Sequence, residues 1–417
     1  MKTNLTKTAL IVFIIAGLSA CNINQSSSDR NSEEPTLPNL KVSENFTWSN
    51  NLFIDLEIQF PDQSLAGTMM EVRYPDGALL SRLNITEQGI SYTEILPDFI
   101  EELVLFHPAS GSSKTIKAES AEINFDIAAS RSASDMPDFA LLNNDDDAGL
   151  LSSFTISHRY HMFEDLWPGT GDFDFNDFVF FSQETFFRNA NNRIERVEVE
   201  VTYLARGANL TYGLGVQVLR GSDNNRVYLP DNSILFDGDA TDDPAASNTA
   251  IISANLNQNS SQWTTFQPRF NTNPTVWSFG FDWDTSLAAN QLPQLHFFLF
   301  SATNRGREIH SVGHPPTEAA SNEWFGTRED NSTTTPWVVQ AGNSFSLPLP
   351  FYRDENNLPW GMSLLVTPLI QPMVIQEKVM ISDAYPFFIG WAQSAGTTNQ
   401  SWWLFPNTNL VLTPPAP

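Results

Sequence analysis

The sequence predicts an all-β protein: a small immunoglobulin-like or transthyretin-like β-sandwich, followed by a larger antiparallel, jelly-roll-like β-sandwich with one or two short helices. Short runs in which apolar and polar residues alternate, the pattern of half-buried strands, recur along most of the chain. Helix signals are sparse. The clearest is Pro386–Ala395, where Phe387, Trp391 and Ala395 recur at every fourth position and Gly396 follows as a cap. The 31 phenylalanines and 11 tryptophans supply ample apolar area for a core.

Strands are predicted in two parts of the chain. In the first part, alternate residues from Leu52 to Ile58 are apolar, and Pro-Asp-Gly at 75–77 predicts a tight turn. Further strands in this part are predicted at Met70–Tyr74, Ile90–Ile95, Glu102–His107 and Ala121–Ile127. Later strands are predicted at Phe154–Met162, Val197–Leu204, Gly213–Leu219, Trp277–Trp283, Gln294–Phe300 and Trp360–Val366.

The N-terminus has the pattern of a secretory signal. Lys2 and Lys7 precede the apolar run Leu10–Ile15, which is too short for a stable transmembrane helix. The Leu-Ser-Ala-Cys sequence that ends at Cys21 resembles a bacterial lipobox, whose cysteine receives a diacylglycerol with acyl chains such as palmitate. Cys21 is the only cysteine, and acylation would remove an unpaired thiol from an oxidising compartment. We therefore expect a membrane anchor at Cys21. The alternative is an ordinary signal with a chance cysteine.

The residue after this cysteine bears on the destination of the protein. It is Asn22 rather than the aspartate that often retains lipoproteins at the inner membrane, so we expect the outer membrane, at its periplasmic face or at the cell surface.

Composition divides the chain into five expected segments. Residues 22–44 are polar and rich in Ser, Asn and Pro, which is typical of a flexible tether. The three acids at 145–147 fall in a stretch without strand pattern, and such a charge run is usually solvated. The predicted segments are a signal at 1–20, a tether at 21–44, a small β-sandwich module at 45–127, a linker at 128–150 and a larger β domain at 151–417.

The charge balance restricts the partners. The chain has 48 acidic and 22 basic residues and a formal charge of −26. Without residues 1–20, which carry two lysines and no acid, 397 residues (417 − 20) remain with a charge of −28 (−26 − 2). Phosphates would meet like charge, so nucleic acid and anionic membrane surfaces are disfavoured. A single cysteine cannot form a disulfide within the chain, so packing, strand pairing and metal binding are left to stabilise it.

The segment FEDLWPGTGDFDFNDFVF, residues 163–180, predicts a metal site. No Lys or Arg occurs between Arg159 and Arg188, so the segment supplies no counter-charge of its own. Crowded carboxylates repel one another and are costly to desolvate unless a cation lies among them, and Ca²⁺ takes six to eight oxygen ligands of this type. The expected Ca²⁺ ligands are Asp172, Asp174, Asn176 and Asp177, with Glu164 or Asp165 completing the shell.

Several details of this site are predicted less directly. D-x-D-x-N from Asp172 matches the start of an EF-hand loop. Asp177 stands where glycine is needed and Gln183 where glutamate is needed, so a true EF-hand is not expected. We instead expect an extended segment, with oxygens on one face and the Phe173 and Phe175 rings on the other, entering a strand near Phe175. The ion would cap the turn at 168–171. Glu308 and Asp330 are candidate further ligands. Without an ion, the acids would cap turns.

Motifs in a fixed order carry a resemblance to a known family. FEDLWP and GDFDFNDFVF, then ARGA (205–208), GLGVQV (213–218), GREIHSVGHPPT (306–317), FGTREDNS (325–332), YRDENNLPWGM (352–362), AYPFFIGWAQSAG (384–396) and SWWLFP (401–406) resemble the LruC-domain proteins, many of them lipoproteins of Gram-negative bacteria. The resemblance runs from about residue 150 to the end, and FTWSNNLFIDLEI (46–58) is similar to a β-module that often precedes the domain. His314 departs from the expected pattern. The resemblance implies an LruC-type fold and an envelope location, since the family has no established activity.

Two function hypotheses follow. The first is a lipid-anchored envelope protein that acts as a binding, structural or adhesion-type module and engages a glycan or another envelope component. The second is a carbohydrate-active hydrolase, in which Glu164 or Asp165 would pair with Glu308 across a cleft.

The sequence gives weaker indications of a zinc site and of sugar binding. His158 with His161, and His310 with His314, are spaced like zinc ligands on a helix, but they fall in predicted strands or turns, where we expect surface or turn histidines. The tryptophans at 360, 391, 402 and 403 could stack on sugars, but core packing is the expectation. A closed shell of oxygens at the acidic segment would favour the structural hypothesis, and an open cleft lined by tryptophan would favour catalysis.

Overall fold

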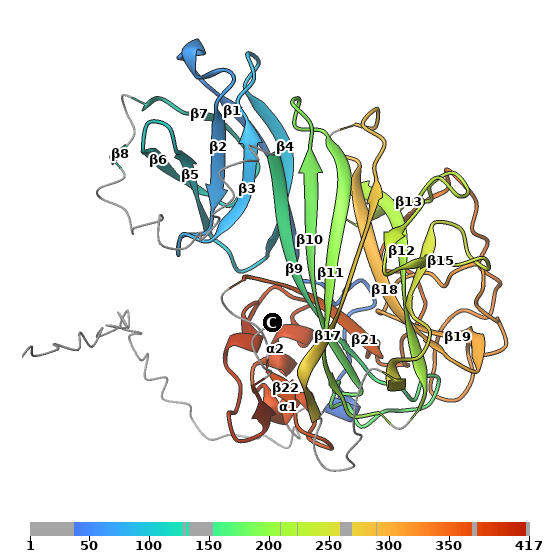
Figure 1. The fold of residues 1–417 in the computed structure, drawn as a ribbon. Coiled ribbons are helices and arrows are strands. Elements are labelled where there is room, and N and C mark those ends of the chain that lie inside the picture. Colours follow the sequence, from blue (N-terminus) through green and yellow to red (C-terminus); the bar gives the residue numbers. More distant parts are fainter. Residues whose placement is uncertain are drawn as a thin grey trace, which may run out of the picture. The chain divides into compact units, whose positions relative to one another are not determined.

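The computed structural model describes residues 37–127, 131–132, 153–208, 210–222, 224–258, 269–288, 290–368 and 373–413 (Figure 1). All of them belong to one compact unit, Thr36–Pro417. Cys21, residues 21–36 of the predicted tether and the three acids at 145–147 lie outside the described residues. In the described part of the chain, no helix combines the length and the apolar character needed to cross a membrane.

The first part of the chain folds into one small sheet and one end of a larger sheet, around a core of its own. One sheet has the order β4-β1-β7, and the strands β3-β2-β5-β6-β8 continue a larger sheet. Ile54, Leu56 and Ile58 alternate with exposed residues on β1 and are buried, as the sequence pattern predicts. The strands are β1 (Asn51–Gln59), β2 (Met69–Arg73), β3 (Leu79–Asn84), β4 (Ile90–Pro97), β5 (Glu102–His107), β6 (Ser112–Lys117), β7 (Ala121–Asn124) and β8 (Arg131–Ser132), with 3₁₀ turns η1 (Leu37–Asn39) and η2 (Gln63–Leu65).

Long antiparallel strands and two short helices make up the rest of the described chain. The strands are β9 (Ser153–Phe163), β10 (Phe178–Arg188), β11 (Ile194–Arg206), β12 (Tyr212–Ser222), β13 (Asn225–Val227), β14 (Asp237–Gly238), β15 (Thr241–Asp242), β16 (Thr249–Ser253), β17 (Arg269–Asp282), β18 (Leu292–Ser301), β19 (Asn304–His310), β20 (Ser344–Ser346), β21 (Gly361–Val366), β22 (Val374–Ile375) and β23 (Val411–Leu412). The helical elements are α1 (Ile381–Ala384), α2 (Phe388–Gln393), η6 (Leu256–Gln258) and η7 (Trp402–Leu404).

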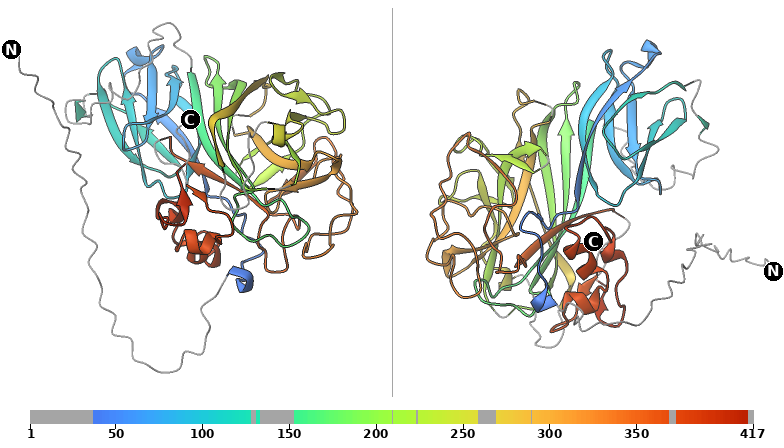
Figure 2. Two further views of the ribbon diagram at one scale, coloured as in Figure 1. Left: turned by 60° about the horizontal axis from the view of Figure 1, so that its bottom comes forward. Right: turned by 180° about the vertical axis from the view of Figure 1, so that it is seen from behind.

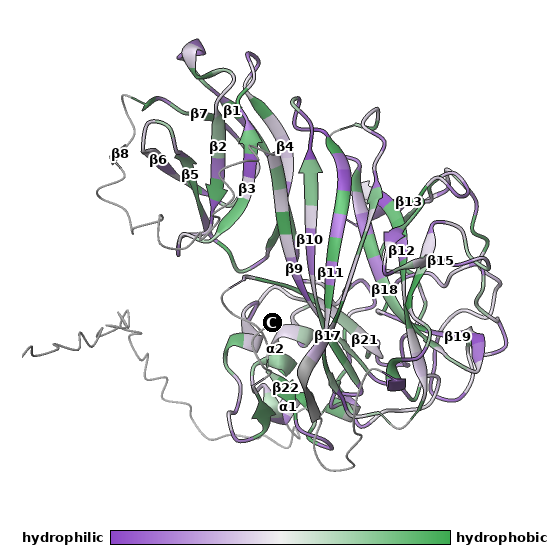
Figure 3. Cartoon of the chain, in the orientation of Figure 1, coloured by the Kyte–Doolittle hydropathy of each residue, from purple (hydrophilic) through white to green (hydrophobic). Residues whose placement is uncertain are grey.

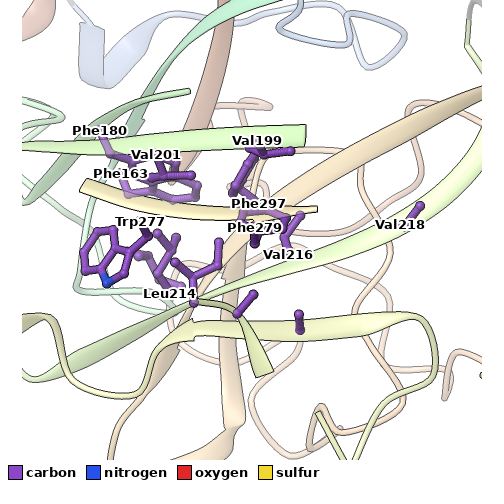
Figure 4. Close-up of a cluster of buried hydrophobic side chains, with 14 of the residues drawn as sticks. Phe163, Phe180, Val199, Val201, Leu214, Val216, Val218, Trp277, Phe279 and Phe297 are labelled. Atoms are coloured by element: carbon purple, nitrogen blue, oxygen red, sulfur yellow. The ribbon is translucent and has the colours of Figure 1, made fainter. Parts of the chain in front are cut away.

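Two sheets pack face to face to form a β-sandwich. The order β14-β17-β11-β10-β9 forms one layer, and β12 pairs with β16 and β18 in the other. Figure 3 shows hydrophobic and hydrophilic bands alternating along β11, whose burial alternates in the same way. Apolar side chains from both layers meet in a core, shown in Figure 4, that includes Phe163, Phe180, Val199, Val201, Leu214, Val216, Val218, Trp277, Phe279 and Phe297. The predicted all-β fold is confirmed.

A second core lies on the other face of β9 and β10. The C-terminal helices pack there against Tyr160 and Phe181, together with the segment that leads into β1 (Figure 2). Trp391, Trp402 and Trp403 are at most 2% exposed, and Trp360 is 4% exposed. Core packing of these tryptophans is therefore confirmed. The predicted helix exists as α2, and Gly396, with φ of +82°, donates its N–H to Trp391 O as the expected cap.

Packing begins earlier in the chain than the sequence predicts. A flexible tether is expected up to residue 44, yet Leu37, Leu40 and Val42 are buried in the second core. These three apolar residues stand in a polar stretch and are too few to produce a hydrophobic pattern that predicts packing. The boundary between the small module and the larger domain stays a prediction; the sheet is continuous across it, because β3 pairs with β9 at Ser81 and Thr155.

The inner core makes a direct prediction about stability. Phe297 is 1% exposed and packs edge-on against Phe180. Phe297→Ala should lower the free energy of unfolding by about 3–5 kcal/mol, because the cavity cannot collapse between two sheets. Phe405→Ala is the matched control: Phe405 is 55% exposed, and its loss should change stability by less than about 0.5 kcal/mol. Denaturant unfolding measures both, and equal effects would contradict this placement of the core.

Candidate metal centre

The acidic segment connects the two central strands of the large sheet. Phe163 ends β9 and faces Phe178 at the start of β10, so the residues that flank this pair are forced together. Glu164 follows β9, and Asp177 precedes β10. The Asp165 N–H donates to Asp177 Oδ2 at 2.7 Å, which ties the two ends of the connection. Strand pairing thus gathers acids that are twelve residues apart in the sequence.

The backbone of the segment differs from the extended conformation that we expect. Phe173 and Phe175 have φ of +58° and +50°, in the left-handed region, and the strand starts at Phe178 rather than near Phe175. This coiling lets the Phe175 N–H donate to Glu164 Oε1 at 2.8 Å, and the Asn176 N–H donate to Asp174 Oδ1 at 3.2 Å. The two phenylalanine rings pack into the second core. The phenylalanine rings and the carboxylate oxygens lie on different sides of the segment, as predicted. Left-handed turns separate them, rather than the alternation of side chains along a strand.

Three carboxylates form the centre of the cluster. Glu164, Asp172 and Asp174 each offer an oxygen, and these oxygens lie within 4.8 Å of one another. Glu164 is 1% exposed, and its Oε2 is buried without a hydrogen-bond partner. The backbone at Gly171 approaches so closely that a Cβ there would lie 2.0 Å from this oxygen. A buried carboxylate oxygen without a donor is costly, and a cation in the space that it faces would remove that cost.

Two further oxygens without partners lie beside this centre. Asn176 donates its amide to Ile375 O at 3.1 Å, which leaves its Oδ1 buried and without a partner, as is Glu377 Oε2. Both face Gly207: a Cβ there would lie 2.0 Å from Asn176 Oδ1 and 2.9 Å from Glu377 Oε2. Glu377 follows β22 and reaches the cluster because the Lys378 N–H donates to Asp174 Oδ2 at 2.8 Å. Sequence reasoning missed Glu377, since a lone glutamate before a lysine carries no pattern.

The electrostatics show how much the cluster lacks positive charge. Burial, with help from Asp177, Asp174 and Asp172, raises the pKa of Glu164 well above its usual value. Burial and the neighbouring Asp172 raise the pKa of Asp174 to about 8. Burial and Asp172 also raise the pKa of Glu377 to about 7. These carboxyls would hold protons near neutral pH unless a cation replaced them.

Positive side chains act on the outer members of the cluster: Lys378 on Glu377, and two arginines on Asp165. Burial raises the pKa of Asp165, and Arg307 and Arg206 oppose that rise. Burial, Asp165 and Asp174 raise the pKa of Asp177 well above its usual value. On Glu164 and Asp174, by contrast, the main charged neighbours are other carboxylates.

The two distant candidate ligands are engaged elsewhere. Glu308 accepts hydrogen bonds from Arg305, from Thr317 and from His310 at 2.8 Å. Burial alone would raise its pKa, but His310 and Arg305 bring it to about 2. Asp330 accepts from Trp167 Nε1 at 3.0 Å, from the Gly326 N–H and from Ser332, and so fixes the turn that it belongs to.

Histidines lie in the core rather than at the surface or in exposed turns. His161 is 1% exposed and sits between Ser363 Oγ at 2.7 Å and Ser182 Oγ at 3.0 Å. His310 is 0% exposed and bonds to Glu308 and to His296. The prediction of surface histidines is wrong for these positions, because neighbouring hydroxyl, imidazole and carboxylate groups satisfy both ring nitrogens inside the sandwich.

The comparisons with known proteins place the chain in a family. Residues 192–403 match the family described as "Domain of unknown function (DUF4842)". The chain belongs to this family. The DUF4842 match starts just before β11, so it includes Gly207 and Glu377 and follows the acidic segment. No curated protein matches the chain.

A solved structure shares the fold of this DUF4842 protein. It is the crystal structure of a "Putative lipoprotein" from Bacteroides ovatus, which is 18% identical and superposes with a TM-score of 0.51. The match covers 83% of this chain and 99% of the other. At this identity the likeness establishes a common fold alone.

The raised pKa values give a prediction about pH. In the presence of a chelator, the folded chain should hold a proton on Asp174 up to about pH 8, whereas the unfolded chain releases it near its ordinary value of 3.8. The folded state then binds more protons in this window, so this group's contribution to stability is lost as pH rises, by up to about 1.4 kcal/mol per pH unit.

The measurement compares the wild type with Asp174→Asn, because the buried histidines act in the opposite sense at acid pH. Denaturant unfolding with chelator at several values from about pH 5 to about pH 8 should show the wild type losing stability relative to the variant. A difference that stays constant or grows in favour of the wild type would refute the assignment.

Proposed function

We propose that this protein is a lipid-anchored envelope protein whose β domain is stabilised by one bound Ca²⁺ and acts as a binding or structural module. The observation that carries the calcium proposal is the group of buried oxygens without donors, Glu164 Oε2, Asn176 Oδ1 and Glu377 Oε2, beside Asp172 and Asp174. A protein that buries such oxygens without an ion would lose several kcal/mol of stability.

The donor set fits the proposed ion. Glu164, Asp172, Asp174, Asn176 and Glu377 provide only oxygen, as hard cations prefer, and side-chain carboxylates with an amide carbonyl are usual Ca²⁺ ligands. Asp165 and Asp177 belong to the predicted ligand set as well. Because Arg206 and Arg307 act on Asp165, we place this pair beside the ion, where Asp177 fixes the start of β10 through the Asp165 N–H.

The anchor rests on the sequence and on likeness. Cys21 ends a lipobox-like sequence, the chain resembles the LruC-domain lipoproteins, and the solved neighbour of similar fold is named a "Putative lipoprotein". Diacylglycerol supplies two acyl chains, which exceeds the marginal membrane affinity of one. Asn22 after the cysteine favours the outer membrane.

The module role is favoured over the hydrolase. Glu164, Asp174 and Asn176 are at most 1% exposed, and the nearby Trp167 is buried with its Nε1–H donated to Asp330. Asp172 is exposed, so protein closes the shell except at this carboxylate, and the site is not an open cleft lined by tryptophan. Glu308, the predicted second acid of the hydrolase, is held by Arg305 and His310. A glycan or another envelope component remains the proposed partner.

The calcium site makes a testable prediction about stability. If Ca²⁺ binds only the folded form, a hundredfold excess over Kd should add about 2.7 kcal/mol of stability and raise the melting temperature by a few degrees relative to chelator. Glu164→Gln should remove most of this difference, because one charged ligand at the centre is lost. Thermal melts in calcium and in chelator measure it.

Glu94→Gln is the matched control. Glu94 is a buried glutamate whose pKa is raised by burial. Unlike those of Glu164, both of its oxygens accept hydrogen bonds, one from Ser81 Oγ and one from the Ile95 N–H. It should respond to calcium as the wild type does. A wild-type melt that is unchanged by chelator, in protein shown to hold no metal, would leave the acids as turn caps.

The anchor makes a separate prediction. Cells that produce the wild type should incorporate a labelled fatty acid into the protein, and Cys21→Ser should abolish the label, because Cys21 is the only thiol. Equal labelling of the wild type and of Cys21→Ser would contradict the lipoprotein assignment. Fractionation of inner and outer membranes tests the location.

A further inference from the structure

A second polar site lies within the sandwich, away from the acidic segment. It is a cavity of about 60 Å³ between β9, β12, β13, β18, β21, the turn after β19 and the segment 47–51 that leads into β1. Its lining is rich in nitrogen and hydroxyl groups, and the residues that matter are Arg159, Arg226, Gln294, His296, Ser311 and His314.

The lining is cationic. Of the described residues that line the cavity, two are arginines and none is acidic. Arg159 has a counter-charge behind it, because Glu184 lies 3.5 Å from its Nε, but Glu184 is not part of the lining. In a chain of net charge −26, a pocket lining with two guanidiniums and no carboxylate is unusual. An anion is the ligand that it would attract.

Three polar atoms of the lining residues are buried without a partner. They are Gln294 Nε2, Ser311 Oγ and His314 Nδ1. The amide nitrogen can only donate, the hydroxyl can donate, and the imidazole nitrogen can donate in one tautomer. Buried polar atoms in native proteins are nearly always paired, so this set calls for an acceptor in the cavity.

A hydrogen-bonded chain behind the cavity holds the imidazoles in place. The ionised Glu308 carboxylate accepts the His310 Nε2–H at 2.8 Å, so His310 Nδ1 accepts from His296 Nε2–H at 2.7 Å. His296 stacks on His314 with ring centroids 3.7 Å apart and the planes within 2°. These contacts fix the orientations of the imidazole rings at the site.

The arginines lie close enough to act on these rings. Burial lowers the pKa of His314 well below its usual value, and Arg226, His310 and Arg159 lower it further. Burial, His314, His310 and Arg226 do the same to His296. Both imidazoles are thus neutral near pH 7, and the guanidiniums carry the positive charge of the site.

We propose that this cavity binds one tetrahedral oxyanion group, a phosphate or a sulfate. Its volume of about 60 Å³ is that of about two liquid water molecules, which suits one such group and excludes a whole sugar. Guanidinium forks match the geometry of phosphate and sulfate oxygens, and charge-assisted hydrogen bonds of this kind are the strong ones. Two sources share this chemistry: the free ion, or the same group carried on a sugar.

Calorimetric titration of the whole chain distinguishes the two sources. Inorganic phosphate, inorganic sulfate and glucose 6-phosphate are each titrated at constant ionic strength, with chloride as the reference anion. Saturable binding of one equivalent per chain is expected for at least one of the three and not for chloride. Binding of glucose 6-phosphate alone identifies a group carried on a sugar. The proposal is overturned if none of the three compounds binds, or if chloride binds as tightly as they do.

Variants tie the binding to the cavity. Arg226→Gln should weaken it about tenfold or more, because a charge-assisted hydrogen bond is lost. Arg226 is 5% exposed, so Ser311→Ala provides a milder change that removes only a hydroxyl and should weaken binding severalfold. Ser157→Ala is the matched control: its Oγ is also buried without a partner, but it lines a different cavity. Equal affinities for Ser311→Ala, Arg226→Gln and the wild type would place the anion elsewhere and refute this site.

Discussion

Carboxylates crowded at the junction of β9 and β10, with too little positive charge among them, are the constraint on which the rest of the structure depends. β9 is the strand that joins the parts of the fold: it pairs with β10 along its whole length, with β21 at one end and with β3 at the other. The acidic segment forms its connection to β10. Whatever neutralises Glu164, Asp172 and Asp174 therefore acts directly on the connection between these two strands.

The same constraint connects distant parts of the chain. Glu377 follows β22, and Gly207 follows β11, yet both border the oxygens of the acidic segment. The Ile381 N–H donates to Phe173 O at 2.8 Å, which joins the start of α1 to the same segment. A cation at this point would stabilise the packing of the C-terminal helices on the outer face of the sheet as well as the turn itself. The cationic cavity lies elsewhere in the sandwich, so the two sites can be tested independently.

Sequence patterns predicted those parts of the fold and of the site that depend on residues close together in the sequence. Alternation predicted strands such as β1 because one face of that strand is buried. The density of acids between Phe163 and Phe180 predicted that Glu164, Asp172 and Asp174 would lie close together. Contacts between distant segments carried no such signal. Glu377, the left-handed turns at Phe173 and Phe175, and the burial of His161 and His310 all depend on where the strands place them. Leu37 and Leu40 are buried by contacts with distant segments, so the polar stretch around them gave no sign of their packing.

The central claim is that an ion, rather than protons, neutralises the oxygens around Glu164. Its most direct test is the calcium content of the purified protein after dialysis into metal-depleted buffer that contains a known low concentration of free Ca²⁺, measured by mass spectrometry of the elements. The account predicts one calcium per chain at saturation. Protein that stays folded and holds no calcium or other divalent metal under these conditions would contradict it.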